Sequence, residues 1–224
     1  MKARPDAILQ REQAEYLDRL LAPSAGLIAE MEEYAARHRV PIADREVALF
    51  LEITARAIKA RRVLEIGMAI SYSVIHLLRG MSSDGLVVTI EPSEEMIARS
   101  EDFLGRAGVR ERVRIEKGRA LDVMPRLGET FDLVFIDAVK EEYGQYLDLA
   151  LPMLREDGVV IVDNLLWGGQ VAGEIRSPDQ AASTEALREF NQKFVRHPHL
   201  RAEILSIGDG LGYGVKTSND QTIL

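Results

Sequence analysis

Five short apolar runs follow one another through the middle of the chain, separated by amphipathic segments of helical length. This alternation predicts parallel strands joined by helices. Because the runs are almost continuously apolar, we expect helices to cover both faces of the sheet, as in a Rossmann-like, doubly wound α/β fold. The runs are RVLEIG (62–67), LVVTIE (86–91), VRIEKG (113–118), FDLVFID (131–137) and GVVIVDN (158–164).

The two ends of the chain show different patterns. Two β-like runs within 201–217 flank the turn GDGLG, which predicts an antiparallel hairpin that completes a mostly parallel, seven-stranded sheet. Residues 1–60 read as N-terminal helices, with Asp44 as a candidate N-cap. A stripe at helical spacing should pack on the core, and consists of Val47, Phe50, Leu51, Thr54 and Ile58.

The length of the chain, 224 residues, suits a single α/β domain. We expect residues 1–60 to form a helical lid or dimer segment and residues 61–217 to form the Rossmann-like core. The net charge is −8 and the basic residues are interleaved with acidic ones, so nothing suggests a nucleic-acid partner. No apolar run approaches the ~18 to 20 residues of a membrane span, and the expected location is the cytoplasm. The absence of cysteine excludes disulfides, thiolate metal sites and cysteine nucleophiles.

The stretch VLEIGMAISYS (63–73) places Gly67 directly after the first predicted strand, at the edge where open parallel sheets bind ligands. It contains one of the three glycines of a dinucleotide-binding loop, which disfavours NAD. Glu91 ends the next strand 24 residues later and could accept two hydrogen bonds from a ribose. A cofactor with a ribose and no pyrophosphate, such as S-adenosylmethionine (SAM), fits both features. The alternative reading of Glu91 is a solvated carboxylate at a strand end.

Two later strand ends carry further polar side chains. Asp137 is followed by Lys140 three residues on, and Asp163 and Asn164 end the next run. If these strands are neighbours, two carboxylates and one amide converge into a partial oxygen shell that suits Mg²⁺. The alternative is that each acid merely caps a following turn or helix.

Residues from about 40 to 217 resemble the cation-dependent class I O-methyltransferases, which include catechol and caffeoyl-CoA O-methyltransferases. The resemblance rests on the order and spacing of RVLEIG…YS, TIEPSEEM, EKGRALDVMPRL, FDLVFIDAVKEEY, GVVIVDNLLWGG and SIGDGLGYGVK. It implies SAM as methyl donor, a divalent cation (Mg²⁺, or another such as Mn²⁺ or Ca²⁺), a small phenolic acceptor and a homodimer. The helices before residue 40 are a candidate for the dimer contact.

The resemblance also implies roles for individual residues. Lys140 would be the catalytic base and Trp167 would help to wall the acceptor pocket. Asp137, Asp163 and Asn164 would hold the cation, with Asp137 also bordering the cofactor. The remaining cofactor contacts would be Glu65, Gly67, Ser71, Tyr72 and Ser73 at the methionine end, Glu91 on the ribose, and Pro92 and Ala120 beside the adenine.

Ser71 departs from the family pattern, which has glycine at this position. A serine fits if its φ stays negative, or at a cost of about 1–2 kcal/mol if the left-handed conformation is forced. We expect the serine to be tolerated and to cap the following helix. Two other functions stay open: a metal-independent methyltransferase acting on another small acceptor, and a non-catalytic regulator that binds SAM.

Overall fold

The structure, a computed structural model, describes residues 11–175 and 177–218. Its centre is one seven-stranded sheet in the order β3-β2-β1-β4-β5-β7-β6. Neighbours from β3 to β5 are parallel, whereas β7 runs antiparallel to both β5 and β6. The predicted doubly wound sheet with a closing antiparallel hairpin is therefore confirmed. The strands are β1 (Arg62–Ile66), β2 (Leu86–Glu91), β3 (Val113–Lys117), β4 (Phe131–Ile136), β5 (Leu154–Val162), β6 (Leu200–Leu205) and β7 (Leu211–Lys216).

Strand β5 begins four residues before the apolar run that predicted it. Leu154 pairs with Phe131, and an irregularity in the register follows before Val159 pairs with Leu133. The extra residues between them are polar, so the apolar pattern could not include them.

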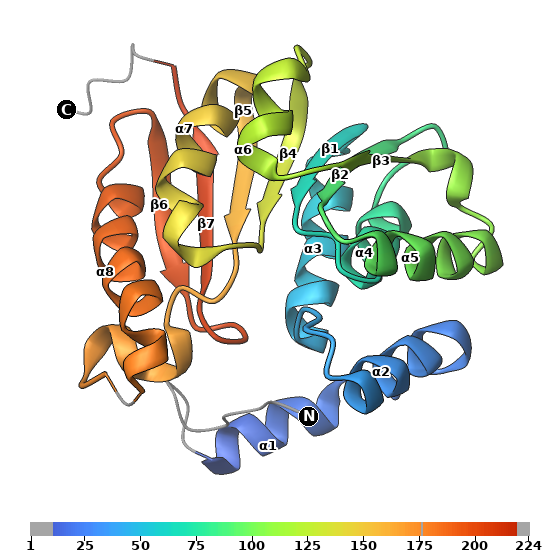
Figure 1. Ribbon diagram of the computed structural model, residues 1–224, viewed down its shortest axis with the longest axis horizontal. Coiled ribbons are helices and arrows are strands. Elements are labelled where there is room, and N and C mark those ends of the chain that lie inside the picture. Colours follow the sequence, from blue (N-terminus) through green and yellow to red (C-terminus); the bar gives the residue numbers. More distant parts are fainter. Residues whose placement is uncertain (1–10, 176, 219–224) are drawn as a thin grey trace.

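Helices cover both faces of the sheet (Figure 1). On β1, Val63 belongs to one apolar core and Leu64 to the other, as the alternation of side chains along a strand requires. The first core packs against α2 (Gly26–His38), α3 (Arg45–Ala57), α4 (Tyr72–Gly80) and α5 (Glu94–Arg106). The second packs against α6 (Ala120–Val123), α7 (Tyr143–Met153) and α8 (Ala181–Val195). Short 3₁₀ turns occur at η1 (Arg110–Arg112), η2 (Met124–Arg126), η3 (Lys140–Glu142), η4 (Trp167–Ala172) and η5 (Pro178–Gln180).

The predicted stripe of α3 faces the core. Val47, Leu51 and Thr54 are buried, and Phe50 and Ile58 are partly buried. Asp44 is the N-cap residue of this helix, as predicted, although its side chain makes no capping hydrogen bond. The side chain lines a cavity instead.

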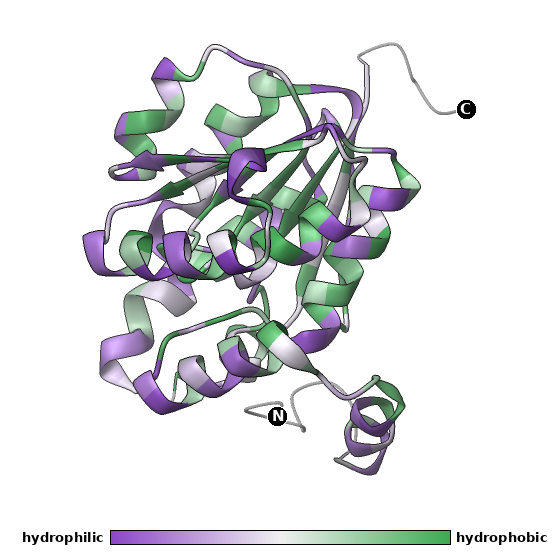
Figure 2. Ribbon diagram, turned by 90° about the vertical axis from the view of Figure 1, so that its right-hand side faces the viewer, coloured by the Kyte–Doolittle hydropathy of each residue, from purple (hydrophilic) through white to green (hydrophobic). Residues whose placement is uncertain are grey.

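Helix α1 (Arg11–Leu20) lies outside the two helix layers (Figures 1 and 2). Ala14 is its buried residue, whereas Tyr16, Leu17 and Leu20 are exposed. In the described ranges, no helix combines the length and the apolar character that a membrane crossing requires.

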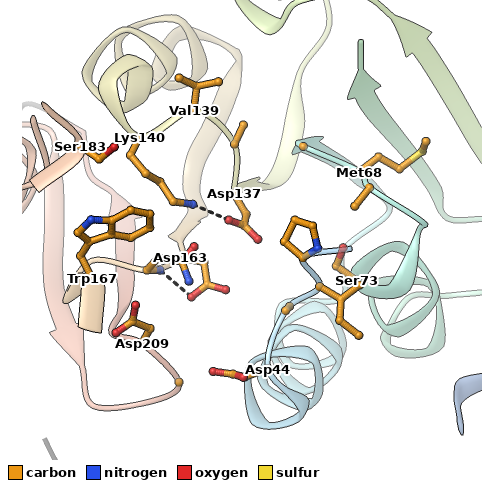
Figure 3. A pocket seen from close by; sticks show the side chains of 18 of the residues that line it. Asp44, Met68, Ser73, Asp137, Val139, Lys140, Asp163, Trp167, Ser183 and Asp209 are labelled. Carbon is orange, nitrogen blue, oxygen red and sulfur yellow. Dashed lines mark hydrogen bonds and ion pairs between the residues drawn. The ribbon is translucent and has the colours of Figure 1, made fainter. Parts of the chain in front are cut away.

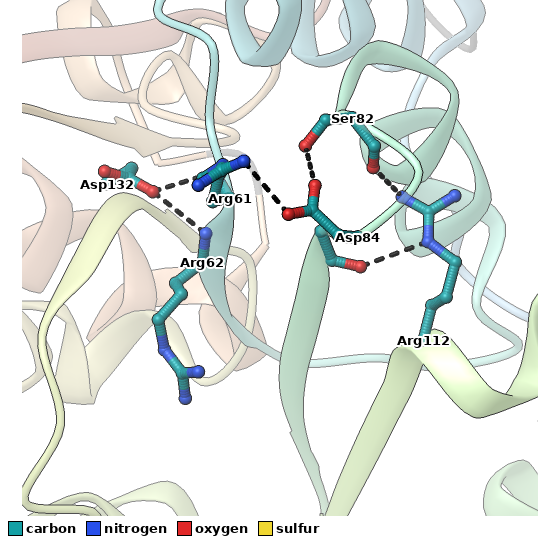
Figure 4. A network of polar contacts seen from close by, with 7 residues as sticks. Arg61, Arg62, Ser82, Asp84, Arg112 and Asp132 are labelled. Carbon is teal, nitrogen blue, oxygen red and sulfur yellow. Dashed lines mark hydrogen bonds and ion pairs between the residues drawn. The ribbon is translucent and has the colours of Figure 1, made fainter.

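At the edge of the sheet where β1 and β4 begin, Asp132 ties neighbouring strands together (Figure 4). Its carboxylate accepts hydrogen bonds from the backbone N–H groups of Arg61 and Arg62 (2.8 and 2.9 Å) and from Arg155 Nε (2.7 Å). Burial acts to raise the pKa of Asp132, but these hydrogen bonds outweigh it and the pKa is lowered. This polar network fixes the sheet at the edge opposite the candidate site.

Candidate active site

A cavity of about 770 Å³ opens at the carboxyl edge of the parallel strands. The loops after β1, β2, β4 and β5 meet there because parallel strands all end at the same edge. In Figure 3, Lys140, Asp137 and Asp163 converge on one side of the cavity, and Met68 and Ser73 lie on the other. The predicted site residues in its lining are Gly67, Tyr72, Ser73, Glu91, Pro92, Asp137, Lys140, Asp163, Asn164 and Trp167.

Three other predicted cofactor residues, Glu65, Ser71 and Ala120, are buried outside this lining. Glu65 reaches the cavity wall indirectly, because Ser73 donates a hydrogen bond of 2.5 Å to one of its carboxyl oxygens and Thr89 donates one of 2.6 Å to the other. Burial raises the pKa of Glu65 to about 8, although these two hydrogen bonds act to lower it. A direct contact of these three residues with the cofactor stays a prediction.

Gly67 is the point where the loop after β1 touches the end of β4. Its φ is +95°, and a Cβ added to it would lie 2.1 Å from the backbone carbonyl oxygen of Asp137. No side chain can occupy that space, so the close approach requires glycine.

The loop is also fixed to the end of β2. Glu91 accepts hydrogen bonds from the backbone N–H groups of Ala69 (3.0 Å) and Ser93 (2.9 Å). It is 8% exposed, so it is not the solvated carboxylate of the alternative reading. A carboxylate has about four lone-pair positions, and two backbone donors leave capacity for ribose hydroxyls.

Ser71 adopts the left-handed conformation, with φ 67° and ψ 24°. It is the N-cap residue of α4, yet its side chain makes no capping bond and its buried hydroxyl has no hydrogen-bond partner among the described residues. The capping prediction is therefore wrong. The physical reason is that a side-chain cap requires an extended backbone at the N-cap, whereas Ser71 is left-handed.

Lys140 lies between the ends of β4 and β5. Its Nζ donates to Asp137 Oδ1 (2.8 Å) and to the hydroxyl of Tyr143 (2.7 Å). Tyr143 in turn donates to the backbone carbonyl of Asp163 (3.1 Å). The Trp167 ring lies 5.9 Å from Lys140 Nζ, so the indole forms a wall beside the amine. Sequence reasoning missed Tyr143, although its spacing of three residues from Lys140 is the signal that could have found it.

Asp163 is 2% exposed, and its Oδ1 accepts from the backbone N–H of Asn164 (2.7 Å). Burial raises the pKa of Asp163 well above its usual range, and the charges of Asp137 and Asp44 add to this effect. Asn164 is left-handed with φ 62°, a conformation that asparagine tolerates better than most residues.

The chemistry of these donors decides whether a cation fits. Within the described ranges, no three His, Cys, Asp or Glu side chains are grouped so that they could hold a metal ion. A cation here would therefore need the Asn164 amide together with Asp137 and Asp163. A buried carboxylate among other negative charges is the environment that a bound cation would relieve, and a divalent cation held by these three residues stays a prediction.

Two further acidic residues, which the sequence analysis did not assign to the site, also line the cavity. Asp44 comes from the start of α3, and Asp209 from the β6–β7 turn accepts from the backbone N–H of Gly168 (2.7 Å). Asp44 read as a cap because it precedes a helix, and Asp209 lies in the GDG sequence of the predicted turn. Neither pattern reveals that Asp44 and Asp209 line the same cavity as the residues that follow β1, β2, β4 and β5.

Comparison with known proteins agrees with this geometry. A family model described as "O-methyltransferase" matches residues 22–217. A catechol O-methyltransferase from Mycobacterium tuberculosis is 43% identical over 156 residues, which is 68% of each chain.

Two solved structures, one with bound SAM and one with bound S-adenosylhomocysteine (SAH), the product that SAM leaves after methyl transfer, are also similar. An O-methyltransferase from Bacillus cereus, in complex with SAH, is 30% identical with a TM-score of 0.79 and 91% and 96% of the two chains covered. An O-methyltransferase from Streptomyces achromogenes, in complex with SAM, is 31% identical with a TM-score of 0.80 and 91% and 95% covered. The chain thus belongs to the O-methyltransferase family and is a SAM-dependent O-methyltransferase of the catechol and caffeoyl-CoA type.

Proposed function

We propose that this enzyme transfers the methyl group of SAM to one hydroxyl of a vicinal dihydroxyaryl acceptor, free or as an acyl conjugate, in a reaction that requires a divalent cation. The observation that carries the proposal is the position of the Lys140 amine beside Asp137, next to the buried Asp163 and in the same cavity as the Gly67 loop. The similarity to a catechol O-methyltransferase supports this class of acceptor.

The cation would be held by Asp137, Asp163 and Asn164, with its remaining positions open to water and to the acceptor. A phenol has a pKa near 10, so its anion is disfavoured at pH 7 by about three units, or roughly 4 kcal/mol. A bound Mg²⁺ supplies Lewis acidity that offsets this cost, and the two neighbouring hydroxyls of the acceptor suit chelation.

The chain's own residues then perform three tasks. Lys140 accepts the proton of the acceptor hydroxyl at Nζ. Glu91 holds the ribose, and the Gly67 loop keeps the methionine end of SAM close to the acceptor. Trp167 covers the acceptor side of the cavity, where its ring lies beside the Lys140 amine.

An activity screen tests the proposal. Catechol and acyl conjugates of dihydroxyaryl acids are incubated with SAM, once with Mg²⁺ and once with EDTA. We expect methylation that EDTA abolishes, a large loss of turnover in Lys140→Ala, and loss of the metal-dependent activity in Asp137→Ala and Asp163→Ala. Activity that survives EDTA would support the metal-independent alternative. SAM binding without turnover on any acceptor would support the regulator.

We also propose a homodimer formed through the N-terminal helices. The exposed Tyr16, Leu17 and Leu20 give α1 an apolar surface without cover from the rest of the described chain. Light scattering of the purified protein should give twice the monomer mass, and Leu17→Lys combined with Leu20→Lys should give the monomer mass. A wild-type protein that runs as a monomer at micromolar concentration contradicts this.

A further inference from the structure

The Tyr143 hydroxyl lies at a junction between the two strand ends that carry the proposed site. The ring is fully buried at the start of α7 and packs edge-on against Phe190 of α8, with the ring centres 5.5 Å apart. A ring held in this way cannot follow movements of the loops around it. The position of its hydroxyl is therefore set by the core and not by the cavity.

The single proton of this hydroxyl is already used. Tyr143 donates it to the backbone carbonyl of Asp163 at 3.1 Å, so toward Lys140 the oxygen can only accept. Burial, together with the nearby negative charge of Asp137, raises the pKa of Tyr143 well above its usual range, which keeps the hydroxyl protonated. The direction of the hydrogen bond from Lys140 to Tyr143 is thus fixed by the bond from Tyr143 to Asp163.

The Lys140 nitrogen has four tetrahedral directions. One is its own side chain, and two are taken by the bonds to Asp137 Oδ1 (2.8 Å) and the Tyr143 hydroxyl (2.7 Å). No other described residue forms a hydrogen bond with Nζ. One direction at Nζ is therefore left without a partner among the described residues.

We propose that Tyr143 is a positioning residue for the methyl transfer: together with Asp137 it holds Lys140 Nζ in place and leaves one direction at this nitrogen for the acceptor hydroxyl. The proposal rests on the proposed function, in which Lys140 accepts a proton. The acceptor O–H bond breaks and an N–H bond forms at Lys140. The oxygen then bonds to the methyl carbon, and the carbon–sulfur bond breaks with its electron pair left on sulfur.

Tyr146 provides a matched control one turn further along α7. It is also almost fully buried and its ring lies 6.3 Å from that of Tyr143, but its hydroxyl donates to Glu142 and has no bond to Lys140. Tyr143→Phe and Tyr146→Phe each remove one hydroxyl and keep the ring. A purely structural role would make the two variants behave alike.

Kinetics with catechol, SAM and Mg²⁺ separate the two roles. We expect Tyr143→Phe to lower kcat roughly 10- to 100-fold, as a displaced catalytic group does, with KM values within about twofold of wild type. Tyr146→Phe should keep the wild-type kcat. In a Lys140→Ala background, adding Tyr143→Phe should leave the residual rate unchanged, because Tyr143 acts through Lys140. An equal loss in both backgrounds would overturn the proposal.

Crystal structures of the two phenylalanine variants give a readout that does not depend on activity. In Tyr143→Phe we expect Lys140 Nζ to move away from its place beside Asp137, and in Tyr146→Phe we expect it to stay. An unmoved Nζ in Tyr143→Phe overturns the inference even if the enzyme methylates catechol. An active Lys140→Ala enzyme, by contrast, refutes the proposed base itself.

Discussion

The carboxyl group of Glu65 accepts a 2.5 Å hydrogen bond from the hydroxyl of Ser73, and Ser73 lines the cavity. Glu65 is fully buried on β1, so an ionised carboxylate there would have little solvation. This buried acid links the stability of the fold to the wall of the site.

The first prediction concerns pH. Burial raises the pKa of Glu65 to about 8, so between its unfolded pKa near 4.5 and about 8 the folded protein binds one proton more than the unfolded chain. The contribution of Glu65 to stability is therefore fully present below pH 4.5 and falls by at most about 1.4 kcal/mol per pH unit up to pH 8. Glu65→Gln should lack this fall.

Urea unfolding at pH 5, 6, 7 and 8 measures the difference. The free energy of unfolding of Glu65→Gln relative to wild type should rise with pH across this window. Thr89→Val is the control, because it removes one hydrogen-bond donor to Glu65 and keeps the titrating carboxyl group. Parallel curves for wild type and Glu65→Gln contradict the prediction.

The second prediction concerns Ser71. Its left-handed backbone costs about 1–2 kcal/mol for a residue with a Cβ, and its buried hydroxyl has no described partner. Ser71→Gly should raise the free energy of unfolding by about 1 kcal/mol after the greater entropy of glycine in the unfolded chain is subtracted. Thermal or urea unfolding measures this.

Ser93 is the matched control for Ser71, because it caps α5 from an extended backbone with φ −84° and accepts from the Met96 N–H. Ser93→Gly should therefore be neutral or lower the stability by a few tenths of a kcal/mol. Calorimetry should show SAM binding to both wild type and Ser71→Gly. If only Ser71→Gly binds SAM, the wild-type serine is not tolerated.

The third prediction concerns Gly67. Gly67→Ala should destabilise the fold by about 2 kcal/mol or more and abolish SAM binding, because the new Cβ would collide with the backbone of Asp137 from a positive φ. Gly105→Ala in α5 is the control, since a Cβ there meets nothing within 4 Å. That substitution should stabilise the helix by roughly 0.5–1 kcal/mol. Equal unfolding midpoints for the two variants would refute this reading of the loop.

The sequence predicted the elements better than the contacts between them. The apolar runs located the strands because a sheet covered on both faces needs apolar residues throughout. The same pattern missed the start of β5, where residues 155–158, between the paired Leu154 and Val159, are polar or glycine and lie in an irregular part of the register. Convergence of Asp137 and Asp163 followed from the common edge of parallel strands.

The features that the sequence did not predict depend on contacts between segments that lie far apart in the chain. Ser71 is left-handed where the loop after β1 enters α4, and no local sequence pattern predicts the sign of its φ. Tyr143 reads as an ordinary apolar position of α7, and its hydroxyl gains a role from Lys140 and the Asp163 carbonyl. Asp44 was predicted only as a helix cap, because the sequence does not show that the fold brings it to the cavity.

The last prediction concerns the opposite edge of the sheet. Backbone N–H groups and Arg155 lower the pKa of Asp132 despite its partial burial, so its contribution to stability is present above the unfolded pKa near 3.9 and is lost as the pH falls through the lowered folded value. Asp132→Asn should lower the free energy of unfolding at pH 7 by about 1–3 kcal/mol, because hydrogen bonds to a charged acceptor are replaced by weaker ones.

Asp84→Asn is the control: this exposed acid pairs with Arg61 at 3.0 Å, and its loss should change the free energy of unfolding much less than the loss of Asp132 does. Urea unfolding at pH 7 and pH 3.5 should show the gap between Asp132→Asn and wild type narrowing in acid, while methyl transfer at pH 7 stays at the wild-type rate because the network lies at the far edge from the cavity. A gap that stays constant with pH would mean that the charge of Asp132 contributes nothing to the strand contacts that it joins.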